Sequence, residues 1–151
     1  MNIMIRKYNE ADYLQIDKIF NLSKKIEMSF SGISMEILSI NEDGNMQKLF
    51  TESEIFVAEN SEYIIGFAGY KGSLISFMFV HPQHFNKGIA KQLFNTLSKN
   101  MEDPWLVVLK ENIPAINLYK KYGFEVFEEF IGNYNGIKCN ALKMKKRLWK
   151  K

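Results

Sequence analysis

The segment from Ile75 to Leu97 constrains the fold more than any other part of the 151-residue chain. It opens with a short apolar run that is aromatic-rich and β-branched at its ends, which favours a buried strand over a helix. Pro82 then interrupts the strand ladder, and after Gly88 the apolar residues recur at helical spacing. We therefore expect a strand, a polar loop and an amphipathic helix in direct succession.

The loop before this helix is suited to holding a phosphate or pyrophosphate. A helix N-terminus presents unpaired N–H groups and the positive end of the helix dipole, and Gly88 lets a ligand approach the backbone closely. No Asp or Glu occurs from residue 63 to residue 101, where the average density of the chain's 17 acids would place about four. The alternative is an ordinary strand and helix in which Gly88 only assists packing. Neither G-x-x-x-x-G-K-[ST] nor, after a strand, G-x-G-x-x-G is present.

Six positions around the loop form a pattern: Val80, Pro82, Lys87, Gly88, Ile89 and Ala90. They resemble the acyl-CoA-binding motif of the GNAT superfamily of N-acetyltransferases, usually written V-x-P-x-x-[QR]-x-x-G-x-[GA]. Phe85 departs from the motif, because Gln or Arg is usual there. The resemblance implies that the pyrophosphate loses that side-chain contact, while the backbone cradle can remain.

A second pattern lies downstream, in Asn112, Ala115, Leu118, Tyr119, Gly123 and Phe124. Its spacing, N-x-x-A-x-x-L-Y-x-x-x-G-F, resembles the other GNAT signature and lies where that family has it. The resemblance covers nearly the whole chain and is weakest over residues 21–53. It implies an α/β (α+β) fold: a mixed sheet of about seven mostly antiparallel strands with helices on both faces, splayed between the fourth and fifth strands, where coenzyme A enters.

The hydrophobic pattern divides the chain into elements of what we expect to be a single domain over residues 1–151. A right-handed crossover should place the strand at 105–109 parallel to the strand at 74–80, and Asn135-Gly136 predicts a hairpin. The stretch 24–36 is expected to break the first helix. The expected strands lie at residues 3–5, 54–59, 63–70, 74–80, 105–109, 125–134 and 137–145, and the expected helices begin after Asn9 or Asp12, span about Met35 to Phe50, follow Gly88, and run from Pro114 to Gly123.

Composition excludes several classes of protein. With 46% hydrophobic and 14% aromatic residues, the chain should bury a substantial core. Its single cysteine, Cys139, cannot form an intramolecular disulfide and joins no Cys/His cluster, so we expect no metal, with His81 and His84 in loop or capping roles. The chain shows no signal peptide and no apolar run of membrane-spanning length, so we expect a soluble cytoplasmic protein with no membrane partner.

The C-terminal residues are strongly basic. Residues 130–151 contain seven Lys or Arg and no acid, and they include Trp149. Such a segment could contact nucleic acid. We favour a solvated end of the last strand that keeps a sheet edge from pairing with other chains, and so expect no nucleic-acid partner.

Backbone groups carry most of the coenzyme contacts that the resemblance implies. A strand that diverges from its neighbour leaves N–H groups unpaired, so residues 78–80 can bind the acyl oxygen and the pantetheine amides. The resemblance also assigns Asn112 to the cofactor arm, although helix capping explains it almost as well. The residues assigned to coenzyme binding are Met78, Phe79, Val80, Phe85, Asn86, Lys87, Gly88, Ile89, Ala90 and Asn112.

Tyr119 matches the position at which GNAT enzymes commonly place a tyrosine as general acid toward the leaving thiolate. A phenol with a pKa near 10 can protonate a thiolate of pKa about 8.5 at a cost of about 2 kcal/mol. A purely structural core tyrosine is the alternative, and Tyr122 is a weaker catalytic candidate. For the general base we name no residue: Glu27, Glu36 and Glu111 are candidates, and each could equally be a solvated surface glutamate.

The expected function is transfer of an acetyl group from acetyl-CoA to a primary amine of a small molecule. A protein N-terminus or lysine is the alternative acceptor, and it would need an open groove. From other classes, the chain could bind acyl-CoA without catalysis or bind nucleic acid through its basic end. We expect the region between the first and second helices to form part of the acceptor pocket, with Met28, Phe30 and Met35 as apolar walls or simply as core. A homodimer is left open.

Overall fold

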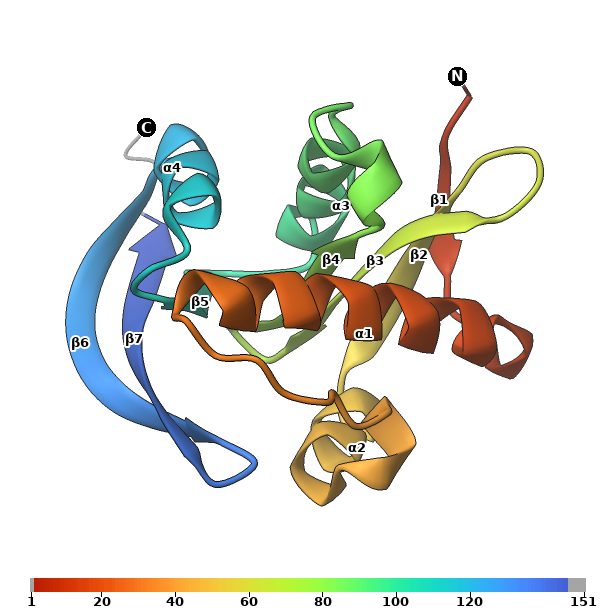
Figure 1. Ribbon diagram of the computed structural model, residues 1–151. Helices are drawn as coiled ribbons and strands as arrows, with labels where there is room; N and C mark the ends of the chain where they lie inside the picture. Colours follow the sequence, from red (N-terminus) through yellow and green to blue (C-terminus); the bar gives the residue numbers. More distant parts are fainter. Residues whose placement is uncertain (1, 147–151) are drawn as a thin grey trace, which may run out of the picture.

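A seven-stranded sheet forms the centre of the molecule in the computed structural model, which describes residues 2–146 (Figure 1). The strand order is β1-β2-β3-β4-β5-β7-β6, and only β4 and β5 run parallel. The strands are β1 (Met4–Lys7), β2 (Glu54–Glu59), β3 (Ile64–Lys71), β4 (Leu74–Val80), β5 (Trp105–Leu109), β6 (Phe124–Tyr134) and β7 (Ile137–Lys146). The predicted mixed, mostly antiparallel fold is confirmed.

Helices cover both faces of this sheet. On one face α1 (Tyr13–Phe30) crosses β3 and β4, as Figure 1 shows, and its apolar side packs on an aromatic cluster that includes Phe67 and Phe77. On the other face α3 (Ile89–Ser98) and α4 (Ile113–Lys121) pack on a second cluster of apolar side chains. The remaining helix is α2 (Gly44–Thr51), and short 3₁₀ turns lie at Glu10–Asp12, Ile40–Glu42 and Pro82–His84.

The first helix is longer than the sequence pattern predicts. Residues 24–36 were expected to interrupt it, yet α1 continues through Phe30 because Met28 is fully buried and anchors its last turns. The helix gives way to a turn at Gly32, whose φ of +71° suits glycine. Of the two predicted caps, Asn9 caps the 3₁₀ turn at Glu10–Asp12, which directly precedes α1, through a capping box with Asp12. The Asp12 side chain makes no cap to α1 itself.

The predicted second helix from Met35 to Phe50 is wrong in its first half. The Asp43 side chain accepts hydrogen bonds from the N–H groups of Asn45 and Met46, so the helix begins only at Gly44. Upstream, residues 33–39 have no helical structure, and Ile33, Met35 and Ile37 pack against the cluster around Met28, Tyr134 and Cys139. Tertiary burial of alternate apolar residues therefore overrides helix propensity there.

A glycine sets how closely α3 approaches the sheet. A Cβ added at Gly66 on β3 would lie 3.0 Å from the Phe79 carbonyl oxygen and 3.4 Å from side-chain atoms of both Ile89 and Leu93. The first turns of α3 therefore rest directly on the β3–β4 pair. This contact fixes the position of the helix N-terminus relative to the end of β4.

The sheet is split between β4 and β5. These two strands share a single pair, Leu74 with Trp105, extended only by the hydrogen bond from the Trp105 N–H to the Ser73 carbonyl at 2.9 Å. Beyond it, β4 pairs with β3 alone and β5 with β7 alone over the described residues. The predicted splay is confirmed.

The basic last strand was expected to lie at an edge of the sheet, and this expectation is wrong. Strand β7 lies inside the sheet, between β5 and β6, and β6 forms the edge. The ammonium of Lys143 lies over the rings of Trp105 and Phe130 and 3.2 Å from Glu128, and that of Lys145 lies over Phe127. These two charges are thus engaged within the sheet, while Arg147 and the residues after it lie outside the described part. Within residues 2–146, no helix is both long and apolar enough to cross a membrane.

Candidate active site

The loop between β4 and α3 leads directly into the N-terminus of α3. Its chain turns at Pro82–His84, where the His81 ring nitrogen Nδ1 accepts a hydrogen bond from the Gln83 N–H at 3.1 Å. Two residues then adopt left-handed conformations, Asn86 at φ +63° and Gly88 at φ +78°, before α3 begins at Ile89. Nothing lies within 4 Å of where a Cβ of Gly88 would be. The N-terminus of α3 is therefore open to a ligand.

The side chains around this cradle divide into exposed and buried ones. Phe85 is 45% exposed, and Asn86 and Lys87 are exposed as well. Ile89 is 1% exposed and belongs to the core under α3, so only its backbone N–H can meet a ligand. Ala90 is half-buried. Recognition at this loop must come mainly from main-chain donors and the Lys87 ammonium.

His84 adds a polar atom without a partner to the same loop. Its Nδ1 is buried and makes no hydrogen bond. Burial lowers the pKa of His84, and the positive charges of Lys87 and His81 lower it further. An incoming phosphate would reverse this balance, because an anion favours the protonated ring. The cradle thus has the donors, the open space and the positive surroundings that fit a pyrophosphate.

The C-terminal end of β4 places its backbone beside the split in the sheet. Met78 and Phe79 are half-buried and Val80 is buried, and all three pair with β3 only. The Val80 carbonyl accepts a hydrogen bond from the Ser23 hydroxyl of α1 at 3.1 Å. Since alternate backbone groups of a strand point to opposite neighbours, half of the polar groups here face the split.

Tyr119 and Asn112 lie at the two ends of α4. The Tyr119 ring packs on the core at 6.1 Å from the Phe124 ring, and burial, the Glu27 carboxylate and Tyr122 raise the pKa of Tyr119 well above its ordinary value. The phenol is therefore protonated at neutral pH. Asn112 is buried, and its Oδ1 accepts a hydrogen bond from the Ala115 N–H at 3.3 Å. Asn112 therefore caps the N-terminus of α4.

The three candidate bases lie in different surroundings. Glu36 is exposed, and Glu111 accepts a hydrogen bond from the Ser31 hydroxyl at 2.7 Å. Glu27 on α1 is half-buried; its Oε2 is buried, makes no hydrogen bond within the described part of the chain and lies 3.4 Å from the Lys24 ammonium.

Tyr134, at the end of β6, was missed by sequence reasoning. Its hydroxyl is buried without a hydrogen-bond partner, and the Lys24 ammonium lies 4.8 Å from its ring centroid. Burial and the carboxylates of Asp43 and Glu27 raise the pKa of Tyr134 to about 12. No local pattern distinguishes this tyrosine, because its partners are more than 90 residues away in the sequence.

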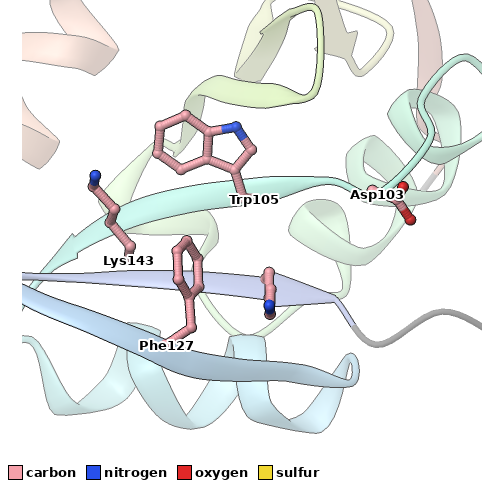
Figure 2. Close-up of a pocket in the computed structure, with 5 residues that line it drawn as sticks. Asp103, Trp105, Phe127 and Lys143 are labelled. Carbon is pink, nitrogen blue, oxygen red and sulfur yellow. The ribbon is translucent and has the colours of Figure 1, made fainter.

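A separate shallow hollow of about 220 Å³ lies over β5, β6 and β7 (Figure 2). It is lined by Asp103, Trp105, Phe127, Lys143 and Lys145. None of the residues assigned to coenzyme binding lines it. Among the described residues, no group of three or more His, Cys, Asp or Glu side chains could hold a metal ion.

The fold is shared with solved N-acetyltransferase structures. YncA of Salmonella typhimurium, a putative acetyltransferase solved with its cofactor acetyl-CoA, superimposes with a TM-score of 0.70 at 20% identity, covering 100% of this chain and 96% of that one. Among related sequences, the Escherichia coli protein YafP, named as an uncharacterized N-acetyltransferase, is 23% identical over 85% of both chains. N-alpha-acetyltransferase 20 of Dictyostelium discoideum is 33% identical over 57% of this chain and 55% of its own length.

The family itself follows from the middle of the chain. Residues 51–126, which run from the end of α2 into β6 and contain both predicted motifs, match the family described as acetyltransferase (GNAT) domain. The chain therefore belongs to the GNAT acetyltransferases and is an acyltransferase.

Proposed function

We propose that this chain is an acetyl-CoA-dependent N-acetyltransferase that acts on the primary amine of a small molecule, with residues 1–151 as one domain. The observation that carries the proposal is the junction of two features. The open N-terminus of α3, at Gly88, lies next to the end of β4, where the sheet is split. A diphosphate and a peptide-like arm are the two ligand parts that such a junction suits.

The coenzyme would be held largely by main-chain groups. In this proposal the N–H groups from Gly88 to Ala90 and the Lys87 ammonium bind the diphosphate, with Asn86 and Phe85 beside it. Residues 78–80 hydrogen-bond the pantetheine amides and the acyl oxygen, and Asn112 lies near the arm. The solved YncA structure with acetyl-CoA supports this choice of coenzyme.

Tyr119 is the proposed general acid. The thioester supplies the acetyl group, and the amine attacks it directly, so the departing sulfur needs a proton. The phenol is protonated, as required, but its raised pKa makes complete transfer to a thiolate more costly by about 1.4 kcal/mol for each unit of mismatch. Transfer concerted with C–S cleavage avoids that cost, because the sulfur gains charge only as the bond breaks.

The packing around the end of α1 supports a small acceptor. Residues 33–37 contact the β6–β7 hairpin through the cluster that contains Met28, Tyr134 and Cys139. In this proposal the contact limits the acceptor site at that end, whereas a peptide needs an open groove. The region between α1 and α2 then forms one wall of the acceptor site.

A protein acceptor is the second candidate, and the relatives favour it. Besides N-alpha-acetyltransferase 20, the chain is 31% identical to the peptidyl-lysine N-acetyltransferase YiaC of Escherichia coli over 48% of this chain and 51% of that one. A peptide would have to pass outside residues 33–37 to reach the split.

Binding and turnover measurements test the proposal. Coenzyme A and acetyl-CoA should raise the melting temperature, whereas ATP, which has phosphates but no pantetheine, should raise it less. Thiol release from acetyl-CoA is then measured with small primary amines, with peptides bearing free N-termini, and with lysine peptides. Faster release with the small amines supports the proposal, faster release with peptides supports the second candidate, and no shift with either coenzyme contradicts both.

A further inference from the structure

Two buried oxygen atoms without hydrogen-bond partners lie at the C-terminal half of α1. They are Glu27 Oε2 and the hydroxyl of Tyr134, a residue that is 8% exposed. Within residues 2–146, Glu27 Oε2 has only its ion pair with Lys24, whereas leaving a buried hydroxyl such as that of Tyr134 without any partner costs about 1–3 kcal/mol. A fold tolerates that cost where a ligand supplies the missing partner.

The Lys24 side chain shows which chemical group suits the space beside Glu27 and the Tyr134 ring. Its ammonium lies 3.4 Å from Glu27 Oε2 and 4.8 Å from the centroid of the Tyr134 ring. A primary ammonium ion is therefore already attracted to this point by a carboxylate and an aromatic face. Lys24 thus marks a position that an acceptor ammonium can take over.

The position of Glu27 relates it to the proposed acyl site. Ser23 lies one helical turn earlier on α1, and its hydroxyl donates to the Val80 carbonyl at the end of β4. The negative charge of Glu27 is also among the causes of the raised pKa of both Tyr119 and Tyr134. Glu27 thus lies among the end of β4, the proposed general acid and the end of β6.

We propose that the carboxylate of Glu27 and the hydroxyl of Tyr134 receive the ammonium group of the acceptor, and that Glu27 takes up its proton. The inference rests on the proposed function and names the base that the sequence left open. The charged and titratable groups facing Glu27 are Lys24 on α1, Tyr119 on α4 and Tyr134 on β6, with Asp43 acting on Tyr134.

The side chains around the proposed ammonium position indicate which class of amine would fit there. Tyr134 belongs to a buried cluster with Met28 and Cys139, against which residues of the 33–37 segment and Leu109 pack. These neighbours are apolar or weakly polar. The acceptor is therefore a primary amine on an alkyl or arylalkyl body, rather than a polyol or a polyamine.

The proposed reaction releases one proton for each amine that is acetylated. The acceptor enters as R–NH₃⁺ and gives one proton to the Glu27 carboxylate, which releases it to solvent. The neutral nitrogen forms the N–C bond and the C–S bond breaks, so the electron pair of that bond goes to sulfur. Tyr119 protonates the sulfur and recovers its proton from the attacking nitrogen. The products are the amide, the free thiol and one proton.

A binding experiment without turnover tests the ammonium site. Phenethylammonium, hexylammonium and propylammonium are added to the coenzyme A complex, with 2-phenylethanol as the uncharged match, and the melting temperature is followed. At least one ammonium should stabilise the wild type and the alcohol should not. In Glu27→Gln, the apparent affinity for the ammonium, taken from the concentration dependence of this shift, should fall at least tenfold. The shift caused by coenzyme A should remain. Lys24→Met should bind the ammonium more tightly, because it removes the internal competitor.

Glu111→Gln is the matched control, since that carboxylate already has Ser31 as its partner. It should bind the ammonium as the wild type does. If Glu27→Gln loses no more affinity than Glu111→Gln, or if no ammonium stabilises a wild type that does bind coenzyme A, the inference is overturned while the coenzyme site stands. If coenzyme A itself gives no shift, it is the proposed function that fails.

Kinetics with an active amine give the second readout. Glu27→Gln should lower kcat/KM by about 10²–10⁴-fold at neutral pH. The deficit should shrink as the pH rises toward the pKa of the amine, because more acceptor then arrives deprotonated. A merely structural Glu27 would instead give a deficit that does not change with pH.

Discussion

In the proposed complex, the two sides of the split sheet recognise their ligands by different means. On the coenzyme side, one continuous segment from β4 to α3 supplies backbone donors, a left-handed glycine and an open helix end. On the proposed acceptor side, Glu27 and Tyr134 are themselves more than 100 residues apart in the sequence, and Lys24 contacts both. A backbone site is encoded locally, whereas a side-chain site is assembled by the fold. The first can therefore be shared across a family, while the second can differ in every member.

The largest expected effect is on stability, and it should be similar on both faces of the sheet, because the two faces differ in recognition and not in packing. Leu93, on the coenzyme face, and Ile16, on the acceptor face, are both fully buried. Leu93→Ala and Ile16→Ala should each lower the free energy of unfolding by about 2–5 kcal/mol, measured by urea denaturation. Leu14→Ala, at a position 81% exposed, is the control and should change it by less than about 0.5 kcal/mol. A small loss at only one of the buried sites would show that one face is loosely packed.

The next effect separates chemistry from binding. Tyr119→Phe should lower kcat by about 10²-fold, the lower end of what general acid catalysis contributes, while the coenzyme A melting shift remains. Tyr122→Phe, one turn further on, should leave kcat near the wild-type value. An unchanged kcat and pH profile for Tyr119→Phe would make Tyr119 a structural residue of the core.

A smaller effect tests the backbone character of the coenzyme side. Gly88→Ala puts a Cβ where φ is +78°, and Gly136→Ala does the same at φ +85° in the β6–β7 turn, with open space at both positions. Each should destabilise the protein by about 1–2 kcal/mol. Only Gly88→Ala should also weaken coenzyme A binding, by about tenfold, measured by isothermal titration calorimetry. Equal coenzyme affinities for the two variants would place the diphosphate elsewhere.

The smallest effect lies away from both sides, at the β1 edge. The Asp12 carboxylate receives two hydrogen bonds from Arg6, at 2.8 and 2.9 Å, and these lower its pKa. A carboxyl group whose pKa is lowered by folding contributes stability above its unfolded pKa of about 3.9 and loses it as the pH falls through the folded value. On acidification, the free energy of unfolding of the wild type should therefore fall by about 1 kcal/mol more than that of Asp12→Asn. The difference is small because Arg6 keeps Glu59 as a second partner.

Ligand binding by Asp12→Asn at neutral pH provides the comparison with the two sides. Coenzyme and amine affinities should equal those of the wild type, measured by the same melting shifts. A changed affinity would show that the β1 edge is coupled to the site.

The contrast between the two sides also explains what could be predicted from the sequence. The strand at Leu74–Val80, the glycine before α3 and the Asn135-Gly136 turn each depend on neighbouring residues, so pattern and turn chemistry locate them. The region from residue 31 to residue 43 could not be predicted in this way. Its apolar residues look helical in sequence, but they pack individually against Met28 and Tyr134, and the Asp43 cap starts the helix late.

The assignment of a base shows the same limit. Glu27, Glu36 and Glu111 are equivalent in sequence. Only the fold shows that Glu36 is exposed, that Glu111 is bonded to Ser31, and that Glu27 is half-buried beside Lys24. Burial and partners are long-range properties. The side chains proposed here to receive the acceptor are thus the ones least visible to sequence reasoning.

The single pair between Leu74 and Trp105 has a consequence for amide hydrogen exchange. Every second N–H of β4 past that pair points away from β3 and has no neighbouring strand to protect it. In the free protein these amides should exchange quickly although they belong to a central strand, and the pantetheine arm should slow them on binding. A bound coenzyme would in this way act as an additional strand, and its pantetheine amides would form the hydrogen bonds that β4 and β5 do not make with each other.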